Sequence, residues 1–304
     1  MRLVCLLIYL SFLVVACAHP AAQTQTPLQA TSASTNTIAP LATQTITVSP
    51  SMAQVKSCEE WQSWPVIPTV SETAQDLYQR GLVRGNDAHA FSKVGDGEIS
   101  TAWFFTAFDL GQGYYDLGPY QDLQPVIHQF DGSFARIGIA ARRGFNTQKI
   151  LDPSLSDASL CVSDEAPLLC ELRLHRPAYA ILSLGTNQVW KPEEFEAGMR
   201  QILEILLSYN VVPILSTKGD NLEGDHRINR TIACLAEEYE IPLWNFWAAI
   251  QPLPNHGLQP DLEHLTYGIT DFDDAQAMQS AWTVRNLTAL QALDAVWRGV
   301  TGQP

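Results

Sequence analysis

The chain has 304 residues, of which 46% are hydrophobic and 16% charged, so it is long and apolar enough to bury a sizeable core. Its formal net charge of −14 argues against nucleic acid or an anionic lipid surface as a partner, because each would repel the chain as a whole. The charge alone indicates nothing about a substrate.

Residues 1–16 are typical of a signal peptide. A positively charged start is followed by an apolar run that ends at Ala16 and is too short to cross a bilayer. Residues 14–17, Val-Val-Ala-Cys, resemble a bacterial lipoprotein cleavage box, in which the cysteine receives the lipid. We therefore expect an exported protein, anchored through a lipid on Cys17 at the outer face of the cytoplasmic membrane or at the cell surface. The alternative is an ordinary signal peptide with an incidental cysteine.

Residues 17–57 are rich in Thr, Ser, Ala, Gln and Pro, with no acidic or aromatic residue and with Lys56 as the only Lys or Arg. Such a segment cannot bury enough apolar surface to offset its loss of conformational entropy, so its composition predicts a flexible tether. Residues 58–304 contain no second linker and no internal repeat, which favours a single domain.

Export permits disulfides, and four cysteines follow Cys17. Cys161 and Cys170 flank a short segment rich in Ser, Asp, Glu and Pro, which predicts a local bridge that closes a loop. Cys234 lies in an apolar, helix-like stretch, so we expect a buried free thiol there. The sequence leaves the pairing of Cys58 open.

A helix is predicted over Thr73 to Arg84, and a short buried strand over Phe91 to Val94. The strand runs into Gly95, Asp96 and Gly97, a glycine-flanked turn that predicts the start of another helix. Enzymes of the α/β hydrolytic type hold a nucleophile at such a turn, since the new helix leaves free N–H groups and a positive dipole end there.

The segment from Trp103 to Pro125 is dense in aromatic residues and is broken by several glycines. One interpretation is a wall that stacks on a sugar ring. Packing into the core under a loop is favoured, because aromatic side chains are commonly buried.

The remaining elements alternate between apolar strands and amphipathic helices. Further strands are predicted at Ser133–Ala141, Ala178–Leu184, Val211–Ser216 and Ile241–Trp247. The helices between and after them are a short one ending near Leu151, one opened by Pro192, one over Ile228 to Tyr239 and one over Ala275 to Arg298. This alternation predicts an α/β fold with a five-stranded parallel sheet covered by helices on both faces.

Ligands of such sheets bind beyond the carboxyl ends of the strands. Asp96, Gly144, Asn187 and the loop after the last predicted strand all fall at those ends. That loop carries Asp261 and His264, whose spacing of three lets a carboxylate orient an imidazole that acts as a base.

In this order, the motifs resemble those of the SGNH/GDSL hydrolase superfamily, whose fold is a three-layer α/β/α sandwich of the flavodoxin-like type. The family's first block, Gly-Asp-Ser, is matched by Gly95 and Asp96, with Gly97 in place of the serine. Its last block, Asp-x-x-His, is matched by Asp261 and His264. The matching blocks run from about residue 91 to 268.

The resemblance also implies an oxyanion hole. Gly144 matches the family's second block, a glycine that donates its N–H. The third block, Gly-x-Asn-Asp, is matched by Gly185 to Asn187, with Gln188 in place of the final Asp. Asn187 would donate its side-chain amide, and the N–H of Gly97 would complete the set.

Three hypotheses follow from the missing serine. Ser100 could supply the oxygen from the next helical turn, although its atom would be displaced by several Å along the axis. His264 and Asp261 could instead activate water, with help from Asp96 or Glu98. The third hypothesis is a noncatalytic domain whose cleft binds cell-surface glycan.

If the cleft is active, the resemblance implies hydrolysis of a small-molecule or glycan ester, such as an O-acyl group on a carbohydrate or lipid. No cofactor or metal is expected. Residues 218–226 hold carboxylates and a histidine, but they lack the alternating oxygen ligands and terminal Glu of a calcium loop. A solvated loop that caps the next helix is favoured there. The sequence does not define the oligomeric state.

Overall fold

The computed structural model describes residues 57–303. The expected signal peptide, the lipidation site at Cys17 and the tether up to residue 56 lie outside the described residues. Within the described part of the chain, no helix is long and apolar enough to cross a membrane.

The core of the domain is a parallel sheet. Its strands are β1 (Asp87–Gly95), β2 (Pro177–Ser183), β3 (Val212–Ser216) and β4 (Leu243–Trp244). They are ordered β1-β2-β3-β4, so each strand pairs in parallel with the next along the chain. The α/β class predicted from the sequence is therefore confirmed, with four strands within residues 57–303 rather than five.

Helices connect the strands and extend the chain beyond them. The main ones are η1 (Cys58–Ser63), α1 (Glu72–Arg84), α2 (Gly97–Ser100), α3 (Thr106–Leu110), α4 (Gln124–Gln129), α5 (Thr147–Ile150), α6 (Pro167–His175), η4 (Thr186–Gln188), α7 (Pro192–Ser208), α8 (Arg227–Glu238), α9 (Phe246–Ile250), η5 (Pro254–Gly257) and α10 (Ala281–Thr301). The last helix begins six residues later than predicted.

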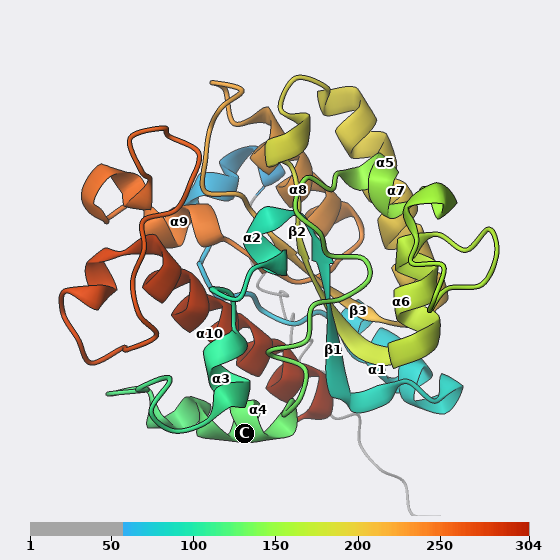
Figure 1. The fold of residues 1–304 in the computed structure, drawn as a ribbon, viewed down its shortest axis with the longest axis horizontal. Coiled ribbons are helices and arrows are strands. Elements are labelled where there is room, and N and C mark those ends of the chain that lie inside the picture. The colour runs from blue at the N-terminus through green and yellow to red at the C-terminus, as the bar shows by residue number, and fades with distance from the viewer. Residues whose placement is uncertain (1–56, 304) are drawn as a thin grey trace, which may run out of the picture. The chain divides into compact units, whose positions relative to one another are not determined.

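The sheet lies between two layers of helices. Because strand side chains alternate between faces, Tyr179 and Ile181 of β2 pack with α1 and α10, whereas Ala180 and Leu182 pack with α6, α7 and α8. Figure 1 shows α10 on the left of the sheet and α6 and α7 on the right. These buried faces hold the strand ends at fixed positions for the site.

The predicted strand at Ser133–Ala141 is not a strand. Only Ala141 forms a bridge, with Gly95 at the end of β1. Polar side chains bind the backbone where ladder hydrogen bonds would form: Lys93 Nζ donates to Phe134 O at 2.5 Å, and buried Glu171 accepts the Ile139 N–H at 2.7 Å. The backbone groups are satisfied without strand geometry, which explains the difference.

The predicted strand at Ile241–Trp247 is shorter than expected. The strand ends at Trp244, because Asn245 turns the chain and accepts the Ala248 N–H to cap α9. Trp244 itself is fully buried. The aromatic segment after α2 also packs largely into the core, as predicted, with Phe104 and Phe105 fully buried.

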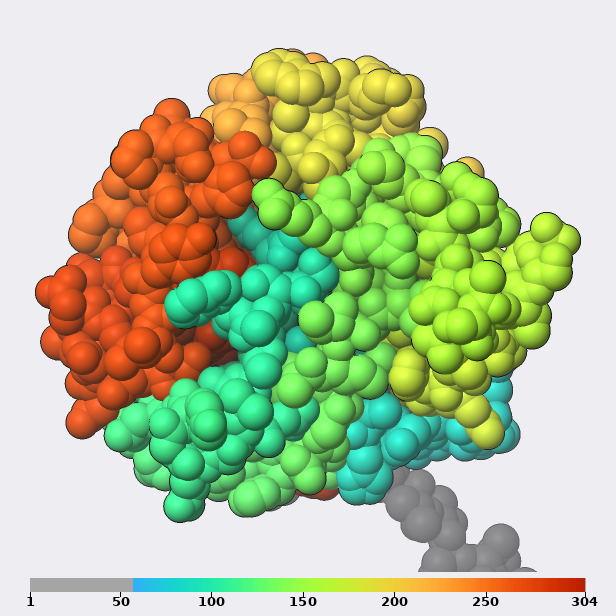
Figure 2. All heavy atoms as spheres, viewed as in Figure 1, coloured from blue at the N-terminus to red at the C-terminus, as the bar shows by residue number. Residues whose placement is uncertain are grey.

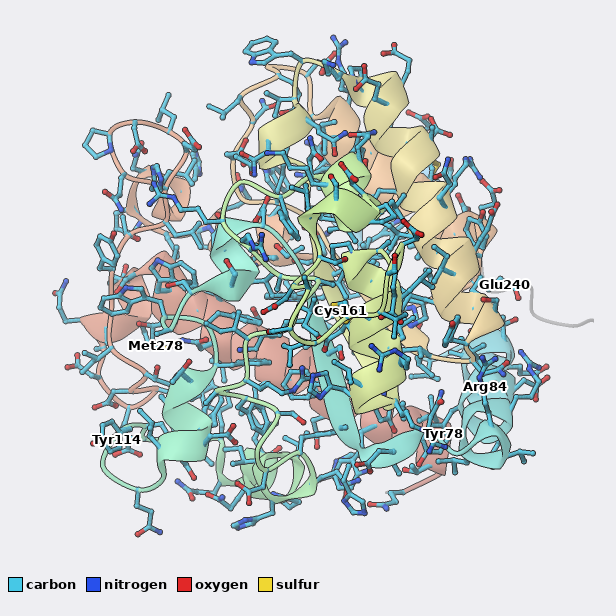
Figure 3. The ribbon with its side chains drawn as sticks, turned by 45° about the vertical axis from the view of Figure 1, so that its right-hand side comes forward. Tyr78, Arg84, Tyr114, Cys161, Glu240 and Met278 are labelled. Carbon is cyan, nitrogen blue, oxygen red and sulfur yellow. A yellow bond between two sulfur atoms is a disulfide. The ribbon has the colours of Figure 1, made fainter. Side chains whose placement is uncertain are left out.

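Two disulfides join the four cysteines of the domain. Cys161 and Cys170 are bonded, as predicted, and Figure 3 shows Cys161 beside α6. The expectation of a free thiol at Cys234 is wrong, because Cys234 is bonded to Cys58. The apolar surroundings of Cys234 include η1, which packs on α8 and brings Cys58 within reach, and sequence spacing could not reveal this contact.

We expect the two disulfides to differ in their contribution to stability. They join cysteines 176 and nine residues apart in sequence. In the chain-entropy description, the first should contribute about 5 kcal/mol and the second about 2.5 kcal/mol to the free energy of unfolding. Urea unfolding of Cys58→Ala/Cys234→Ala should therefore show the larger loss, and Cys161→Ala/Cys170→Ala the smaller. Equal losses would contradict the prediction.

Candidate active site

The turn after β1 places the first site residues. A side chain at Gly95 would bring its Cβ within 2.0 Å of Ser183 O, and φ is 154°, so only glycine fits this close approach. Asp96 then donates its backbone N–H to Ser183 O at 3.2 Å, and its carboxylate accepts the Glu98 N–H at 3.2 Å as the cap of α2. The predicted start of a helix at Gly97 is confirmed.

A hollow of about 600 Å³ opens beside this turn. Its lining residues come from loops that lie far apart in sequence: Asp96, Gly97, Glu98, Ser100, Thr101, Trp103, Arg143, Gly144, Thr186, Asn187, Gln259, Glu263, His264, Leu265, Tyr267 and Trp282. Figure 2 shows the blue-green segment after β1 recessed between orange and green segments. The convergence expected at the strand ends is thus present.

His264 and Asp261 form a hydrogen-bonded pair on the loop after η5. The ring Nδ1 lies 2.8 Å from Asp261 Oδ2, while Asp261 Oδ1 accepts the backbone N–H groups of His264 and Glu263. These hydrogen bonds lower the pKa of Asp261 to about 2, so the group is an acceptor at neutral pH. Nδ1 therefore carries the proton, and Nε2 is available as a base.

The hollow also holds two candidate donors to an oxyanion. Asn187 donates one amide hydrogen to Phe145 O at 3.0 Å, which fixes the amide and leaves its second hydrogen for a ligand. Gly144 has φ of 78°, which suits a sharp turn of the chain, and its N–H donates to no other group that the structure describes. Both line the hollow together with Gly97.

Gln188 stands where the resembled family has an Asp, and its role here is structural. Its side chain is buried, accepts the Thr147 N–H at 2.9 Å and donates to Gln148 Oε1 at 2.7 Å. These bonds tie η4 to α5. They hold the segments of Asn187 and Gly144 beside each other.

The loop after β3 accepts N–H groups at the start of α8, as predicted, through Asp225 and Glu223. Its first part is buried rather than solvated, contrary to the prediction. Lys218 is buried and contacts the carboxylates of Asp220 and Glu223, each at 2.6 Å. Asp220 in turn accepts the Thr186 hydroxyl at 2.6 Å, next to Asn187. Opposite charges that neutralise one another can be buried, which a count of charged residues does not reveal. Through its hydrogen bond to Thr186, the loop after β3 holds the start of η4 in place.

A buried cation lies beneath the turn. Arg285 of α10 is fully buried, lies 3.4 Å from Glu98 Oε2, and donates to Ser183 Oγ at 2.8 Å. Its guanidinium also lies over aromatic rings, the nearest being Phe246 at 4.6 Å. Burial lowers the pKa of Arg285, and the carboxylates of Glu98 and Asp96 oppose this effect.

The two carboxyl groups of the turn have raised pKa values, so they lose their protons at a higher pH than free carboxyl groups do. Burial, with the charge of Glu98, raises the pKa of Asp96 to about 8. Burial also raises the pKa of Glu98, although Arg285 opposes it. The environment thus favours their neutral forms more than water does.

Ser100 lines the hollow, one helical turn after Gly97. Its hydroxyl makes no hydrogen bond to His264 or to any other residue that the structure describes. It also borders a neighbouring hollow of about 420 Å³, to which Arg143 contributes as well. Ser100 is therefore present at the site but is not coupled to the base.

Several residues of the site were not predicted. The burial of Arg285 could have been predicted from the sequence, because it is the only charged residue among the inward-facing positions of a long helix. Trp103 belongs to the segment for which a sugar-stacking wall was the less favoured interpretation, and nothing in its sequence context separated it from the buried aromatic residues nearby. Tyr267, which also lines the hollow, was not predicted. Arg143, which also lines the hollow, was not predicted either.

The described residues contain two clusters with metal-ligand chemistry. They are Cys58, Glu59 and Cys234, and Cys161, Glu165 and Cys170. In each cluster the two sulfurs are bonded to each other, so neither offers a thiolate to an ion.

Fold and site together define an α/β protein with a cleft at the carboxyl ends of its parallel strands. No protein-family model matches the chain, and no curated protein does. Solved structures that match include a GDSL-like lipase from Bacteroides thetaiotaomicron, with 15% identity and a TM-score of 0.40, over 73% of this chain and 98% of the lipase.

A catalytic mutant of an acetylxylan esterase from Geobacillus stearothermophilus also matches. It has 14% identity and a TM-score of 0.43, over 70% of this chain and 98% of the esterase. The lipase carries the GDSL name of the superfamily that the motifs resemble. At such low scores the likeness gives no information about activity, which has to follow from the geometry of the site.

We expect Asp96 to make stability depend on pH. The folded chain keeps this proton up to about pH 8, whereas the unfolded chain releases it near the ordinary value of 3.8. Between these values the folded state binds more protons, so its stability falls as pH rises. Asp96→Asn keeps the cap and should therefore gain stability over the wild type from about pH 4 to about pH 8.

Urea unfolding at a series of pH values measures this difference. The same substitution at exposed Asp131 is the control and should follow the wild-type profile. A constant difference between Asp96→Asn and the wild type across the pH range would show that Asp96 titrates normally.

Proposed function

We propose that the chain is an ester hydrolase that removes O-acyl groups from a carbohydrate or lipid. One observation carries the proposal: a histidine held by a carboxylate lines the same hollow as Asn187, Gly144 and Gly97. A base beside a set of N–H donors is the arrangement that acyl transfer to water requires.

In this proposal water is the nucleophile. His264 Nε2 takes a proton from water as the water oxygen attacks the acyl carbon, and the carbonyl electrons move onto oxygen. The amide of Asn187 and the N–H groups of Gly144 and Gly97 stabilise the oxyanion. When the intermediate collapses, the ester C–O bond breaks and His264 returns the proton to the leaving alkoxide. The products are an alcohol and a carboxylic acid.

Asp261 and Glu98 have supporting roles in this proposal. Asp261 fixes the ring orientation and stabilises the protonated imidazole that forms during attack. Glu98 lines the hollow together with His264, and a positive charge on His264 opposes the rise that burial causes in the pKa of Glu98. Asp96 holds the turn that presents the N–H of Gly97.

We also propose that the protein is exported and lipid-anchored through Cys17. The signal-like start and the tether composition support this, and both lie almost entirely outside the described residues. A negatively charged catalytic domain held off a membrane by a spacer would meet esters of the cell envelope or its surroundings.

Hydrolysis of p-nitrophenyl acetate tests the function. We expect His264→Ala to lower kcat/KM by about 10²-fold or more, since a general base contributes on this order. His128→Ala, at an exposed histidine that does not line the hollow, is the matched control and should keep wild-type activity. Equal activity of the wild type and His264→Ala would exclude the proposed site.

Ser100→Ala distinguishes the two candidate nucleophiles. If water attacks, the variant should retain the rate within a few-fold, because Ser100 makes no hydrogen bond with the base. A loss as large as that of His264→Ala, in a protein with an unchanged unfolding midpoint, would assign the attack to Ser100 instead.

Gly97→Ser should create a faster enzyme. A Cβ at position 97 would meet Arg143 Cγ at 3.8 Å, an ordinary contact, and the backbone is not left-handed there. The added hydroxyl would stand in the cleft as a nucleophile, so we expect kcat to rise about a hundred-fold, with a burst of p-nitrophenol. Gly97→Ala is the matched control, because it adds the Cβ without the oxygen. If neither the wild type nor Gly97→Ser cleaves any ester, the proposed hydrolase is refuted, and the result favours the hypothesis of a noncatalytic domain with a binding cleft.

A further inference from the structure

Two exposed aromatic rings stand beside each other at the hollow. Trp103 is 48% exposed and Tyr267 is 62% exposed, and their ring centroids lie 5.1 Å apart at 49°. They come from different segments, since Trp103 follows α2 and Tyr267 lies three residues after His264. Both line the hollow that holds the proposed base.

The backbones of both rings are held firmly. The Trp103 carbonyl accepts the amide of Asn286 at 2.9 Å, and the same Asn286 side chain binds the Phe105 N–H at 2.9 Å. Next to Tyr267, Thr266 accepts N–H groups from the start of α10 through both its carbonyl and its hydroxyl. The backbone that carries the two rings is therefore fixed, so a ligand has to order only the two side chains.

We propose that Trp103 and Tyr267 form a binding platform for a neutral sugar ring. The inference rests on the proposed function, and it specifies the substrate class as an O-acylated carbohydrate. A sugar ring has an apolar C–H face that packs on aromatic surfaces, while its hydroxyls require polar partners. Because Tyr267 and His264 share one loop, a ring on the platform places its O-acyl group beside the base.

The chemistry of the hollow favours a sugar over a lipid tail. Beyond the aromatic pair, most of the lining residues carry polar side chains, including Gln259 and Glu263 on the loop of the base and Thr186 on η4. An acyl chain would require an apolar sleeve, which these side chains do not form. The net charge of −14 also disfavours anionic polysaccharides, since they would be repelled.

Two other exposed aromatic residues provide matched controls. Trp190 is 80% exposed and Tyr114 is 61% exposed, and neither lines the hollow. Figure 3 shows Tyr114 at the outer end of the loop after α3. Substitutions of Trp190 and Tyr114 therefore show the effect of losing an exposed aromatic side chain elsewhere on the surface, against which the loss of Trp103 or Tyr267 can be compared.

Calorimetric titration of the full-length chain with cellohexaose, xylohexaose and chitohexaose tests the platform, in a detergent without a sugar headgroup. We expect at least one oligosaccharide to bind, and Trp103→Ala and Tyr267→Ala each to weaken its affinity roughly ten-fold or more. Trp103→Phe should restore most of the affinity. Trp190→Ala and Tyr114→Ala should bind as the wild type does.

A second readout uses the O-acetylated form of the oligosaccharide that binds. Loss of the platform should raise KM about ten-fold, while His264→Ala should lower kcat and keep the affinity. The platform is refuted if no oligosaccharide binds, if the ring variants bind as tightly as the controls, or if the rings instead govern binding to phosphatidylcholine vesicles. Cleavage of p-nitrophenyl acetate without sugar binding would refute the platform alone. Sugar binding through both rings without cleavage of any ester would support the platform and refute the proposed hydrolase.

Discussion

The close approach of β1 and β2 at their carboxyl ends constrains the rest of the cleft. Residue 95 cannot carry a side chain, because Ser183 O occupies the space where its Cβ would be. The backbone of Asp96 is then bound to Ser183, and the Ser183 hydroxyl is bound by Arg285. One strand end thus fixes the turn, the start of α2 and the buried cation of the last helix.

This constraint explains why a charged group can lie at the base of the site. Arg285 is isolated from water, so its charge is tolerable only near Glu98 and aromatic rings. Its charge opposes the rise that burial causes in the pKa values of Asp96 and Glu98. Asp96, Glu98 and Arg285 interact in a site of low dielectric constant, so a substitution of one of them should alter the charge state of the others.

Most of the sheet followed from the sequence, because the buried strands are continuous apolar runs with clear ends, as at Ala178 to Leu184. The convergence of Asp96, Asn187 and His264 followed from topology, since carboxyl ends of parallel strands meet at one edge. The prediction of a strand at Ser133–Ala141 was wrong. Backbone groups of this segment form hydrogen bonds with side chains that lie far away in sequence, such as Glu171. Contacts between polar groups far apart in sequence, including Thr186 with Asp220, have no local pattern to detect.

The long-range disulfide also determines how the domain responds to mechanical load. A pull applied at Ser57 enters at Cys58 and crosses directly into α8 through the bond to Cys234. Residues 59–233 form a covalently closed loop, so such a pull cannot unravel them one after another. The turn after β1, Gly144 and Asn187 all lie within this loop, and the cleft walls they build are therefore shielded from tension.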